Sequence, residues 1–299
     1  MKMKQKHRFN LTPFEVKPNQ IVNLKDYNPG YTEQIEGKKH SKETLREDIE
    51  DLARAQELLW ASKENSLLII FQAMDAAGRD GTIKHVMSGI NPQGCDVFSF
   101  KAPTEEERLH HFLWRPQQYL PPRGKIAIFN RSYYEEVLVV KVHPEMLTKE
   151  WIPHHLKGTP LDELWQSRYR EINEFEHRVT RNGVSVIKFF LHLSKNEQKK
   201  RFLKRLNSPE RQWKFSLSDL NERQYWDDYQ KAFEDMLSAT STYEAPWYVI
   251  PADNKWFMRA LVADIITSRI EKMKLKPPKV SKEMAKAVEK IKKQFEAEP

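Results

Sequence analysis

The chain has 299 residues, of which 39% are hydrophobic and 31% are charged, and its formal net charge is +8. Its 15 Phe, 10 Tyr and 8 Trp supply enough apolar surface for a sizeable core, which excludes a largely disordered protein. A single cysteine, Cys95, excludes a disulfide framework and a zinc site with several cysteines. The longest apolar runs are far too short to cross a bilayer, so no membrane partner is expected.

The N-terminus is basic but has no apolar stretch behind it, so no secretory signal is expected. The reducing cytoplasm is therefore the expected compartment. A pI near 9.2 is compatible with a polyanionic partner, such as a phosphate chain, a nucleotide or a nucleic acid. It is equally compatible with a lysine-rich soluble surface, and the distribution of the basic residues must decide between the two.

Residues 1–40 are polar and basic and contain several turn-forming residues, which predicts an arm that drapes over a neighbour. From Ser41 the apolar residues recur at helical spacing. Residues 66–71 then form a short apolar run followed by turn residues, which is typical of a buried parallel strand. Further strands are predicted at Val97–Phe100, Ile126–Phe129, Val184–Leu191 and Trp247–Ile250.

Helical patterns separate these apolar runs. Thr104 and Glu107 match the capping box, in which each side chain accepts a hydrogen bond from the other residue's backbone amide. Ser194 and Glu197 repeat this pattern, and a long helix is predicted to begin just after Pro160. Strands that alternate with helices imply βαβ units, and therefore an α/β fold with a parallel sheet covered on both faces.

The stretch 195–223 is rich in Lys and Arg, which predicts a helical hairpin that projects from the sheet as a lid. Arg201 and Arg205 are four residues apart and are expected on one helical face, where a lid supplies charge to a reacting phosphate. A solvated basic surface and a nucleic-acid site are the alternatives. The nearby Trp and Tyr residues follow helical patterns, which favours packing over base stacking.

Residues 276–299 follow two prolines and carry apolar side chains at helical spacing. They predict an amphipathic helix that packs on the body or on another subunit, and hence a homo-oligomer, with a solvated tail as the alternative. The expected organisation is an arm at 1–40, one α/β domain at 41–275 with its lid at about 195–223, and a C-terminal helix at 276–299.

A glycine-bearing turn follows the first predicted strand, within the segment FQAMDAAGRDGTIK at 71–84. Ligands of an open parallel sheet bind beyond the carboxyl ends of its strands. In such a turn, consecutive backbone N–H groups can point at one anion, and the following helix adds the positive end of its dipole. Arg79 and Lys84 add full charges, and Asp75 can hold a divalent cation beside the phosphates.

This turn departs from the phosphate-loop pattern G-x-x-x-x-G-K-S/T at three positions. Ala73 replaces the first Gly, Arg79 replaces Lys, and Asp80 replaces Ser or Thr. Similar turns also occur in sheets that bind no phosphate, so the segment alone leaves both interpretations open.

A second polar cluster, FNRSYYEE at 129–136, follows the strand predicted at 126–129. Arg131 can bind phosphate oxygens through two parallel hydrogen bonds, while Asn130 and Glu135 can orient a metal ion or its water. The alternative is a helix N-terminus whose dipole is complemented by Glu135 and Glu136. Both interpretations can hold at once.

Taken together, five segments of the chain resemble the polyphosphate kinase 2 family. They are 71–84, 91–94, 129–135, 188–195 and 245–253, and they cover roughly residues 20 to 275 in order. The resemblance implies a P-loop, thymidylate-kinase-like fold with three α/β/α layers, a parallel sheet and a helical lid. It also implies Mg²⁺-dependent phosphoryl transfer between inorganic polyphosphate and a nucleotide, with Mn²⁺ as a substitute ion. The expected nucleotides are those of adenine, with guanine as a second base, and no nucleic-acid partner is expected.

The resemblance also assigns roles to individual residues. The catalytic residues would be Asp75, Arg79, Arg131 and Glu135, with Asp75 as the metal ligand. The substrate-binding residues would be Ala76, Ala77, Gly78, Asp80, Gly81, Lys84, Asn130, Arg201 and Arg205. With Glu135, the chain resembles the family branch that phosphorylates both nucleoside mono- and diphosphates, because other branches tend to carry Asp or Asn at this position.

The family carries Lys where this chain has Arg79, and a planar guanidinium is not equivalent to a compact ammonium at a tight phosphate site. The main prediction is a polyphosphate-dependent kinase that converts AMP to ADP and ADP to ATP, in a reaction that can run in either direction. The basic charge balance supports it, since a phosphate chain needs a basic channel and no stacking surface. The alternatives are an ATP-dependent nucleoside monophosphate kinase and a polyanion-binding protein that Arg79 has weakened catalytically.

Overall fold

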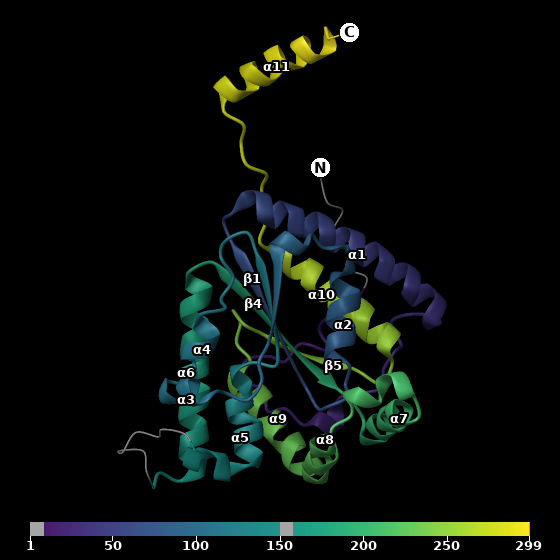
Figure 1. Ribbon diagram of the computed structural model, residues 1–299, viewed down its shortest axis with the longest axis vertical. Coiled ribbons are helices and arrows are strands. Elements are labelled where there is room, and N and C mark those ends of the chain that lie inside the picture. The colour runs from purple at the N-terminus through teal and green to yellow at the C-terminus, as the bar shows by residue number, and fades with distance from the viewer. Residues whose placement is uncertain (1–8, 150–157, 299) are drawn as a thin grey trace.

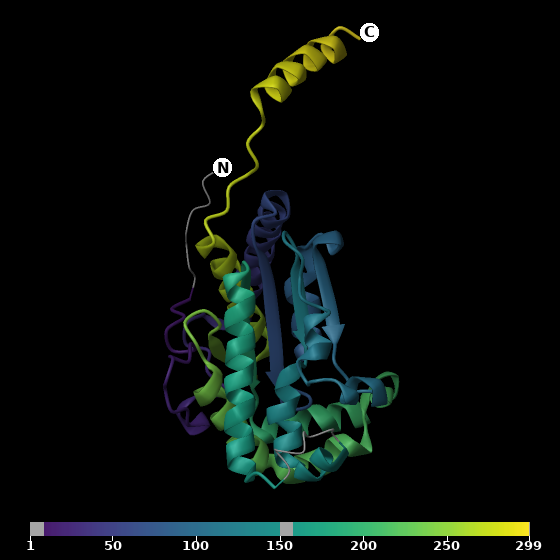
Figure 2. The same ribbon diagram turned by 90° about the vertical axis from the view of Figure 1, so that its left-hand side faces the viewer.

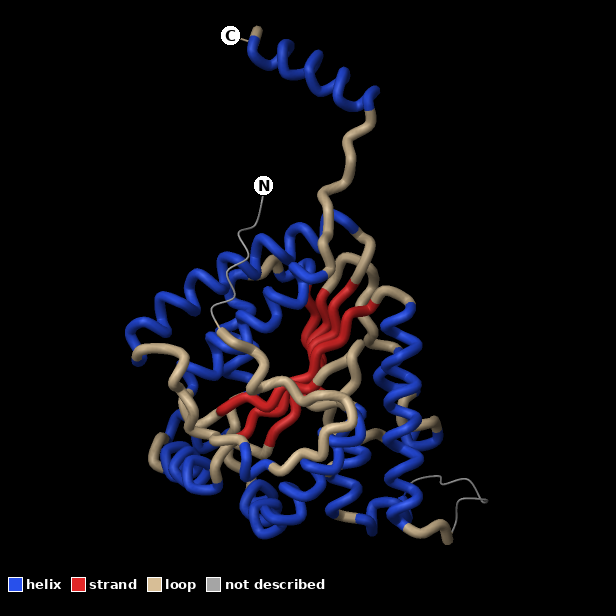
Figure 3. Tube along the Cα trace, turned by 180° about the vertical axis from the view of Figure 1, so that it is seen from behind, coloured by secondary structure: helices blue, strands red, loops and turns tan. Residues whose placement is uncertain are grey.

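The computed structural model describes residues 9–149 and 158–298, so the first eight residues of the predicted arm lie outside the described part. The five predicted strands are confirmed and form one parallel sheet with the order β2-β3-β1-β4-β5. The strands are β1 (Ser66–Ala73), β2 (Cys95–Ser99), β3 (Ile126–Asn130), β4 (Val184–His192) and β5 (Trp247–Pro251). Figure 3 shows this sheet between two layers of helices.

The two helical layers are buried against opposite faces of the sheet. Leu67 and Ile69 of β1 belong to the core under α1, α2 and α10, whereas Leu68 and Ile70 belong to the core under α6 and α9. Because both faces are covered, β1 has a continuous apolar sequence rather than an alternating one. The predicted three-layer α/β/α fold is therefore confirmed. The helices are α1 (Gly37–Ser62), α2 (Arg79–Val86), α6 (Leu161–Arg181), α9 (Trp226–Thr240) and α10 (Lys255–Lys272).

The predicted helix starts are confirmed with one difference. Thr104 forms the full capping box at α3 (Glu105–Leu109). Ser194 accepts a hydrogen bond from the Glu197 amide at 3.1 Å and so caps α7 (Lys195–Leu206), but the Glu197 carboxylate binds Arg201 instead of returning to the Ser194 amide. The buried guanidinium of Arg201 donates to the Glu197 carboxylate, and the Ser194 amide donates to Asp253 instead. The reciprocal half of this capping box was therefore wrongly predicted.

Shorter elements connect the main ones. They are α4 (Trp114–Gln117), α5 (Val139–Val142), α8 (Leu217–Glu222) and 3₁₀ helices at Leu24–Asp26, Met87–Gly89, Pro92–Gly94, Tyr133–Val137, Pro144–Lys149, Pro209–Lys214 and Arg223–Tyr225. In the stretch predicted as a lid, α7 and α8 are joined by one of these 3₁₀ helices, and they lie beyond the carboxyl ends of the strands (Figure 1).

The N-terminal arm lies along its own domain. The amide of Val16 donates to the Trp247 carbonyl at 2.9 Å, and the amide of Val249 donates to the Phe14 carbonyl at 2.8 Å. The side chain of Phe14 is buried and packs near Phe257 of α10. The arm therefore covers the edge strand β5, whose backbone groups would otherwise be open to pairing with another chain.

The C-terminal helix α11 (Lys282–Glu296) extends away from the body in both views of the molecule (Figures 1 and 2). Its apolar side chains are between 47% and 67% exposed, and they are Met284, Val288, Ile291 and Phe295. Packing of this helix on the body is therefore not seen, and packing on another subunit stays a prediction. Among the described helices, none is long and apolar enough to cross a membrane.

Candidate active site

The turn between β1 and α2 has the geometry of an anion-binding site. The backbones of Ala76 and Gly78 have positive φ angles of 64° and 106°, and these tight conformations bring the chain into α2. Gly78 is the N-cap residue of α2, and no side chain caps the helix there. The first amides of α2 are therefore available to a negative ligand at the positive end of the helix dipole.

Arg79, the first residue of α2, folds back onto this turn. Its Nη1 donates to the Ala73 carbonyl at 2.7 Å, and its Nη2 lies 3.7 Å from Oδ1 of Asp75. Burial, and then repulsion from the nearby Arg131, lowers the pKa of Arg79. One arm of the guanidinium is thus bound to the loop's own backbone rather than left for a phosphate.

Arg131 bridges two carboxylates beside the turn. It donates to Oδ1 of Asp75 at 2.8 Å and to Oε2 of Glu135 at 3.3 Å. Its backbone has a φ of 65°, which is rare outside glycine, and its amide donates to the Phe71 carbonyl at 3.1 Å. Strained backbone of this kind persists where the surroundings hold it, and it clusters at functional sites. The four residues predicted as catalytic, which include Arg79, are thus brought together.

Polar contacts tie the ends of β1, β3 and α2 to one another. Nδ2 of Asn130 donates to Oδ1 of Asp80 at 2.8 Å, so these two predicted substrate-binding residues bind each other. Nε2 of Gln72 donates to the Ser132 hydroxyl at 3.1 Å in the interior. These contacts fix the position of the segment that carries Arg131.

A buried ion pair supports the same segment from the sheet side. Nζ of Lys188, on β4, lies 2.5 Å from Oε2 of Glu176, on α6, and both side chains are at most 1% exposed. The hydroxyls of Tyr133 and Tyr134 both donate to Oε1 of Glu176, at 2.8 and 2.7 Å. Burial lowers the pKa of Lys188, and the attraction of the Glu176 carboxylate opposes that shift. The pair therefore anchors the two residues that follow Ser132.

Arg201, predicted to bind the polyanion, is buried and fully engaged. Its Nη1 donates to the carbonyls of Ala76 and Ala77 at 3.1 and 2.7 Å, and its Nη2 donates to the carbonyls of residues 252 and 253 at 2.6 and 3.0 Å. Its Nε donates to Glu197 at 3.0 Å. A direct contact with substrate would break these bonds. The geometry therefore favours a positioning role, in which Arg201 ties the turn to the loop after β5.

The two other predicted basic ligands are placed differently. Arg205 points to Asp219 of α8, with 3.7 Å between Nη1 and Oδ2, and so links the two lid helices. Burial and the nearby Asp75 carboxylate raise the pKa of Asp219, so this residue lies close to the site although the sequence did not predict it. Lys84 is exposed on α2 and forms no ion pair with the described residues. Substrate binding by Arg205 and Lys84 stays a prediction.

Asp75 fits the expected metal ion. Its Oδ1 accepts a hydrogen bond from Arg131, while its Oδ2 forms no hydrogen bond within the described part of the chain. Mg²⁺ is commonly held by one or two carboxylates together with substrate phosphates and water. Across residues 9–149 and 158–298, no three His, Cys, Asp or Glu side chains gather into a ready-made metal site. The donor set therefore suits a cation that arrives bound to phosphate.

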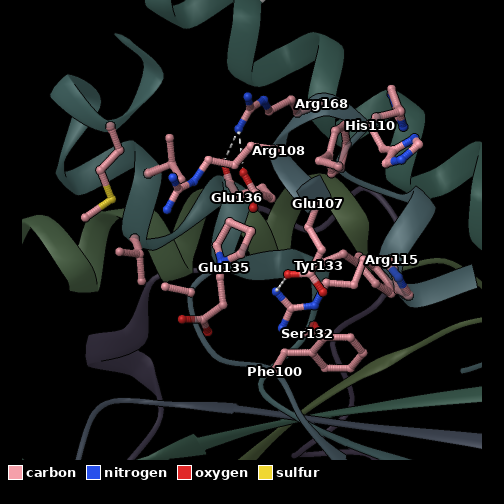
Figure 4. Close-up of a pocket in the computed structure, with 18 of the residues that line it drawn as sticks. Phe100, Glu107, Arg108, His110, Arg115, Ser132, Tyr133, Glu135, Glu136 and Arg168 are labelled. Atoms are coloured by element: carbon pink, nitrogen blue, oxygen red, sulfur yellow. Dashed lines mark hydrogen bonds and ion pairs between the residues drawn. The ribbon is translucent and has the colours of Figure 1, made fainter. Parts of the chain in front are cut away.

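A pocket of about 530 Å³ opens beside this cluster (Figure 4). Its lining includes residues that directly follow β2 and β3, so it lies beyond the carboxyl ends of these strands. Phe100 lies on one side of it, and Arg168, which binds Glu136 at 3.2 Å, lies on the opposite side. Arg131 and Glu135 also line the pocket. The turn after β1 and the pocket therefore meet at Arg131.

The cations of the pocket wall differ in their availability. Arg115 pairs with Glu107 at 3.2 Å and lies over the Phe100 ring, with 4.7 Å between the guanidinium carbon and the ring centroid. The side chain of Arg108 lines the pocket as well, and within the described part of the chain its guanidinium forms no ion pair or hydrogen bond. Its guanidinium is therefore available to a ligand phosphate. The sequence predicted only the helix that carries it, through the capping box at Thr104.

Comparison with known proteins agrees with this geometry. Residues 34–278 match the family model for Polyphosphate kinase 2 (PPK2). The chain is 52% identical over 247 residues to the ADP-polyphosphate phosphotransferase of Rhodopseudomonas palustris, with 82% of this chain and 84% of that protein covered. It is 42% identical over 266 residues to the AMP/ADP-polyphosphate phosphotransferase of Meiothermus ruber, with 89% and 94% covered. The crystal structure of Polyphosphate Kinase 2 from Arthrobacter aurescens TC1 superposes with a TM-score of 0.82 at 37% identity, over 91% of this chain and 93% of that one.

Proposed function

Since the chain belongs to the polyphosphate kinase 2 family, we propose that it transfers phosphoryl groups from inorganic polyphosphate to AMP and to ADP. One observation carries this proposal: an uncapped phosphate-binding turn and a nucleotide-sized pocket share Arg131. The relative from Rhodopseudomonas palustris is named for ADP alone, and the relative from Meiothermus ruber is named for both AMP and ADP. Glu135 supports the broader acceptor range.

The donor phosphate would bind at the turn. The free amides at the start of α2 supply hydrogen bonds to its oxygens, and Asp75 would hold Mg²⁺, or Mn²⁺ in its place, against it. A divalent ion supplies positive charge that neutralises the phosphate oxygens during transfer. The carboxylate at position 75 is oriented for this task by its hydrogen bond from Arg131.

The acceptor nucleotide would occupy the pocket. Its volume of about 530 Å³ lies within the range of small-ligand sites, and Phe100 offers the base an apolar wall. Arg108 and Arg131 lie where they could bind the acceptor's phosphate. Adenine is the proposed base, and guanine nucleotides are proposed as a second substrate class.

The proposed reaction needs no proton abstraction from the acceptor, because its phosphate oxygen is already negatively charged. Catalysis therefore rests on alignment of the two phosphates and on stabilisation of charge during transfer. Arg131 lies beside both proposed sites, so its positive charge would stabilise the negative charge on the phosphate oxygens during transfer. Arg201 contributes indirectly. Its guanidinium binds the carbonyls of Ala76 and Ala77, which leaves the backbone amides of the turn to face the ligand.

Two further assignments accompany this function. The cytoplasm is the proposed compartment, which the single free cysteine supports. Self-association through α11 is also proposed, supported by its exposed apolar side chains.

Replacement of the donor tests the proposed function. Purified protein is incubated with AMP and Mg²⁺, first with polyphosphate and then with ATP instead, and the nucleotides are separated by chromatography. We expect ADP to form with polyphosphate and not to form at a comparable rate with ATP. The reverse pattern would indicate an ATP-dependent monophosphate kinase, and binding of polyphosphate without turnover would indicate a polyanion-binding protein.

A further inference from the structure

Helix α7, the first helix of the lid stretch, binds the carbonyl side of the turn through two buried residues. Gln198 and Arg201 are three positions apart, so their side chains lie on the same face of the helix. Nε2 of Gln198 donates to the Asp75 carbonyl at 2.9 Å. Arg201 donates to the next two carbonyls, those of Ala76 and Ala77. Three consecutive carbonyls of the turn are therefore bound by one helix of the lid.

The hydrogen bond from Gln198 orients one peptide unit of the turn. The carbonyl of Asp75 and the amide of Ala76 belong to the same planar trans unit, in which they point in opposite directions. Because α7 holds the carbonyl, the Ala76 amide is turned to the opposite side. Ala76 has a φ of 64°, and left-handed residues of this kind help successive amides to form an anion-binding concavity. The same peptide unit begins at Asp75, the residue that would hold the metal ion.

Arg223 binds the other half of the Gln198 amide group. It directly follows α8 in the 3₁₀ helix Arg223–Tyr225, and its Nη1 donates to Oε1 of Gln198. The same nitrogen donates at 3.0 Å to the carbonyl of Lys195, the first residue of α7. Arg223 therefore joins the beginning and the end of the lid stretch at the side chain that binds the turn.

The chemistry of both contacts suits glutamine. A guanidinium only donates hydrogen bonds and a backbone carbonyl only accepts them, so the side chain between Arg223 and the Asp75 carbonyl must offer one acceptor and one donor. The amide of Gln198 does both at once, and it is 1% exposed. Neither an apolar side chain nor a carboxylate of similar size can satisfy both partners.

The residue before Arg223 is anchored on the side of the pocket. Oε2 of Glu222 accepts a hydrogen bond from the Tyr229 hydroxyl at 2.6 Å and lies 2.9 Å from Nε2 of His143. His143 directly follows α5, whose Val140 lines the pocket. The end of the lid stretch is therefore linked to the turn on one side and to the pocket wall on the other.

We propose that Gln198 is a positioning residue for phosphoryl transfer, which couples the position of the lid to the orientation of the Asp75–Ala76 peptide unit. The inference rests on the proposed function, which places the donor phosphate and the metal ion at this turn. Movement of Arg223 with the lid breaks its hydrogen bond to Gln198, and the Gln198 amide is then no longer held against the Asp75 carbonyl. The turn thus keeps its geometry for transfer only while the two ends of the lid stay joined.

Kinetics of two substitutions at position 198 test this role. Gln198→Met removes both hydrogen bonds with little change in size, whereas Gln198→Glu keeps an acceptor for Arg223 and removes the donor to the Asp75 carbonyl. Arg223→Gln removes the guanidinium, alone and in the double variant with Gln198→Met. The matched control is Gln224→Met, because Gln224 is exposed in the same 3₁₀ helix as Arg223. The kcat and the KM for AMP are measured with polyphosphate as the donor, and urea unfolding checks that each variant is folded in the assay.

We expect each substitution at position 198 to lower kcat about tenfold, since the Asp75 carbonyl loses its hydrogen bond, while the KM for AMP changes less than about twofold. Arg223→Gln should lower kcat about fivefold in the parent but less than about twofold in the Gln198→Met background. Such non-additivity is expected of two residues that act through one contact. The control variant should match the parent.

Three results would overturn the inference. The first is a kcat close to that of the parent in both variants at position 198. The second is a pair of losses that multiply in the double variant, which would mean that Arg223 acts independently of Gln198. The third is a raised KM for AMP with an unchanged kcat, which would place Gln198 in substrate binding. The absence of transfer from polyphosphate in the parent and the control alike would instead overturn the proposed function.

Discussion

The guanidinium of Arg131 donates to Oδ1 of Asp75 at 2.8 Å, although the two residues are 56 positions apart in the chain. They meet because β1 and β3 are neighbours and run parallel, so both strands end at the same edge of the sheet. The contact joins the carboxylate that would hold the metal ion to a cation that lines the pocket proposed for the acceptor. In the proposed function, this one residue pair couples the donor and acceptor sites.

Asp75→Asn should lower kcat on the order of 10²- to 10³-fold, because it removes negative charge from the group that would hold the metal ion at the reacting phosphate. The amide keeps the size of the side chain, so the fold should be retained. Steady-state rates at saturating Mg²⁺ measure the effect, with circular dichroism as the control for folding. Activity close to that of the parent would show that Asp75 holds no essential ion.

Arg79→Lys should raise kcat several-fold while the affinity for polyphosphate changes less. The Arg79 guanidinium is held by the Ala73 carbonyl, whereas a lysine ammonium is a mobile point charge that can follow the phosphoryl group. Binding that is equally strong in the ground and transition states does not speed the chemical step. Comparison of kcat and KM for the parent, Arg79→Lys and Arg79→Ala tests this explanation. A slower lysine variant would mean that the loop is adapted to arginine, and an alanine variant equal to the parent would mean that position 79 contacts no reacting phosphate.

The sequence predicted the features that depend on one strand and the turn after it. Asp75 and Arg131 could be identified because polar side chains that follow an apolar strand lie at the ligand-binding edge of a parallel sheet. Their meeting requires only that β1 and β3 be neighbours. The α/β fold could be predicted as well, because the alternation of strands and helices is visible in short stretches of the sequence.

Features built from distant backbone groups could not be predicted in this way. Arg201 appeared to be a lid ligand because its charge is visible in the sequence, whereas its carbonyl partners lie 51 to 125 residues away and have no residue-type signal. Lys188 lies inside an apolar strand run and shows no pattern that pairs it with Glu176. The acceptor pocket likewise exists only after β2 and β3 are placed side by side.

Arg108→Gln should raise the KM for AMP roughly 10- to 100-fold with a smaller change in kcat, because a hydrogen bond to a charged phosphate is worth about 1.5–3 kcal/mol. Arg123→Gln is the matched control, since Arg123 is an exposed arginine before the amino end of β3. Initial rates over a range of AMP concentrations separate the two parameters. An unchanged KM would mean that the acceptor phosphate lies away from Arg108.

Lys188→Met should lower the free energy of unfolding by about 3–5 kcal/mol, because it leaves the Glu176 carboxylate buried without its partner. The double variant Lys188→Met/Glu176→Gln should recover part of this loss, since the glutamine oxygen can still accept from Tyr133 and Tyr134. Urea unfolding of the parent, both single variants and the double variant gives the coupling energy. Additive losses would contradict a coupled pair.

The time course of nucleotides formed from AMP, with polyphosphate as the sole phosphoryl donor and Mg²⁺ present, tests the central claim most directly. The proposed function predicts that ADP appears first and that ATP follows as ADP accumulates, because the proposal takes Glu135 as the mark of an acceptor range that includes both nucleotides. ADP that accumulates without ATP would restrict the enzyme to monophosphates. An enzyme that leaves AMP unchanged but phosphorylates ADP would restrict it to diphosphates, and the absence of any transfer from polyphosphate would contradict the account as a whole.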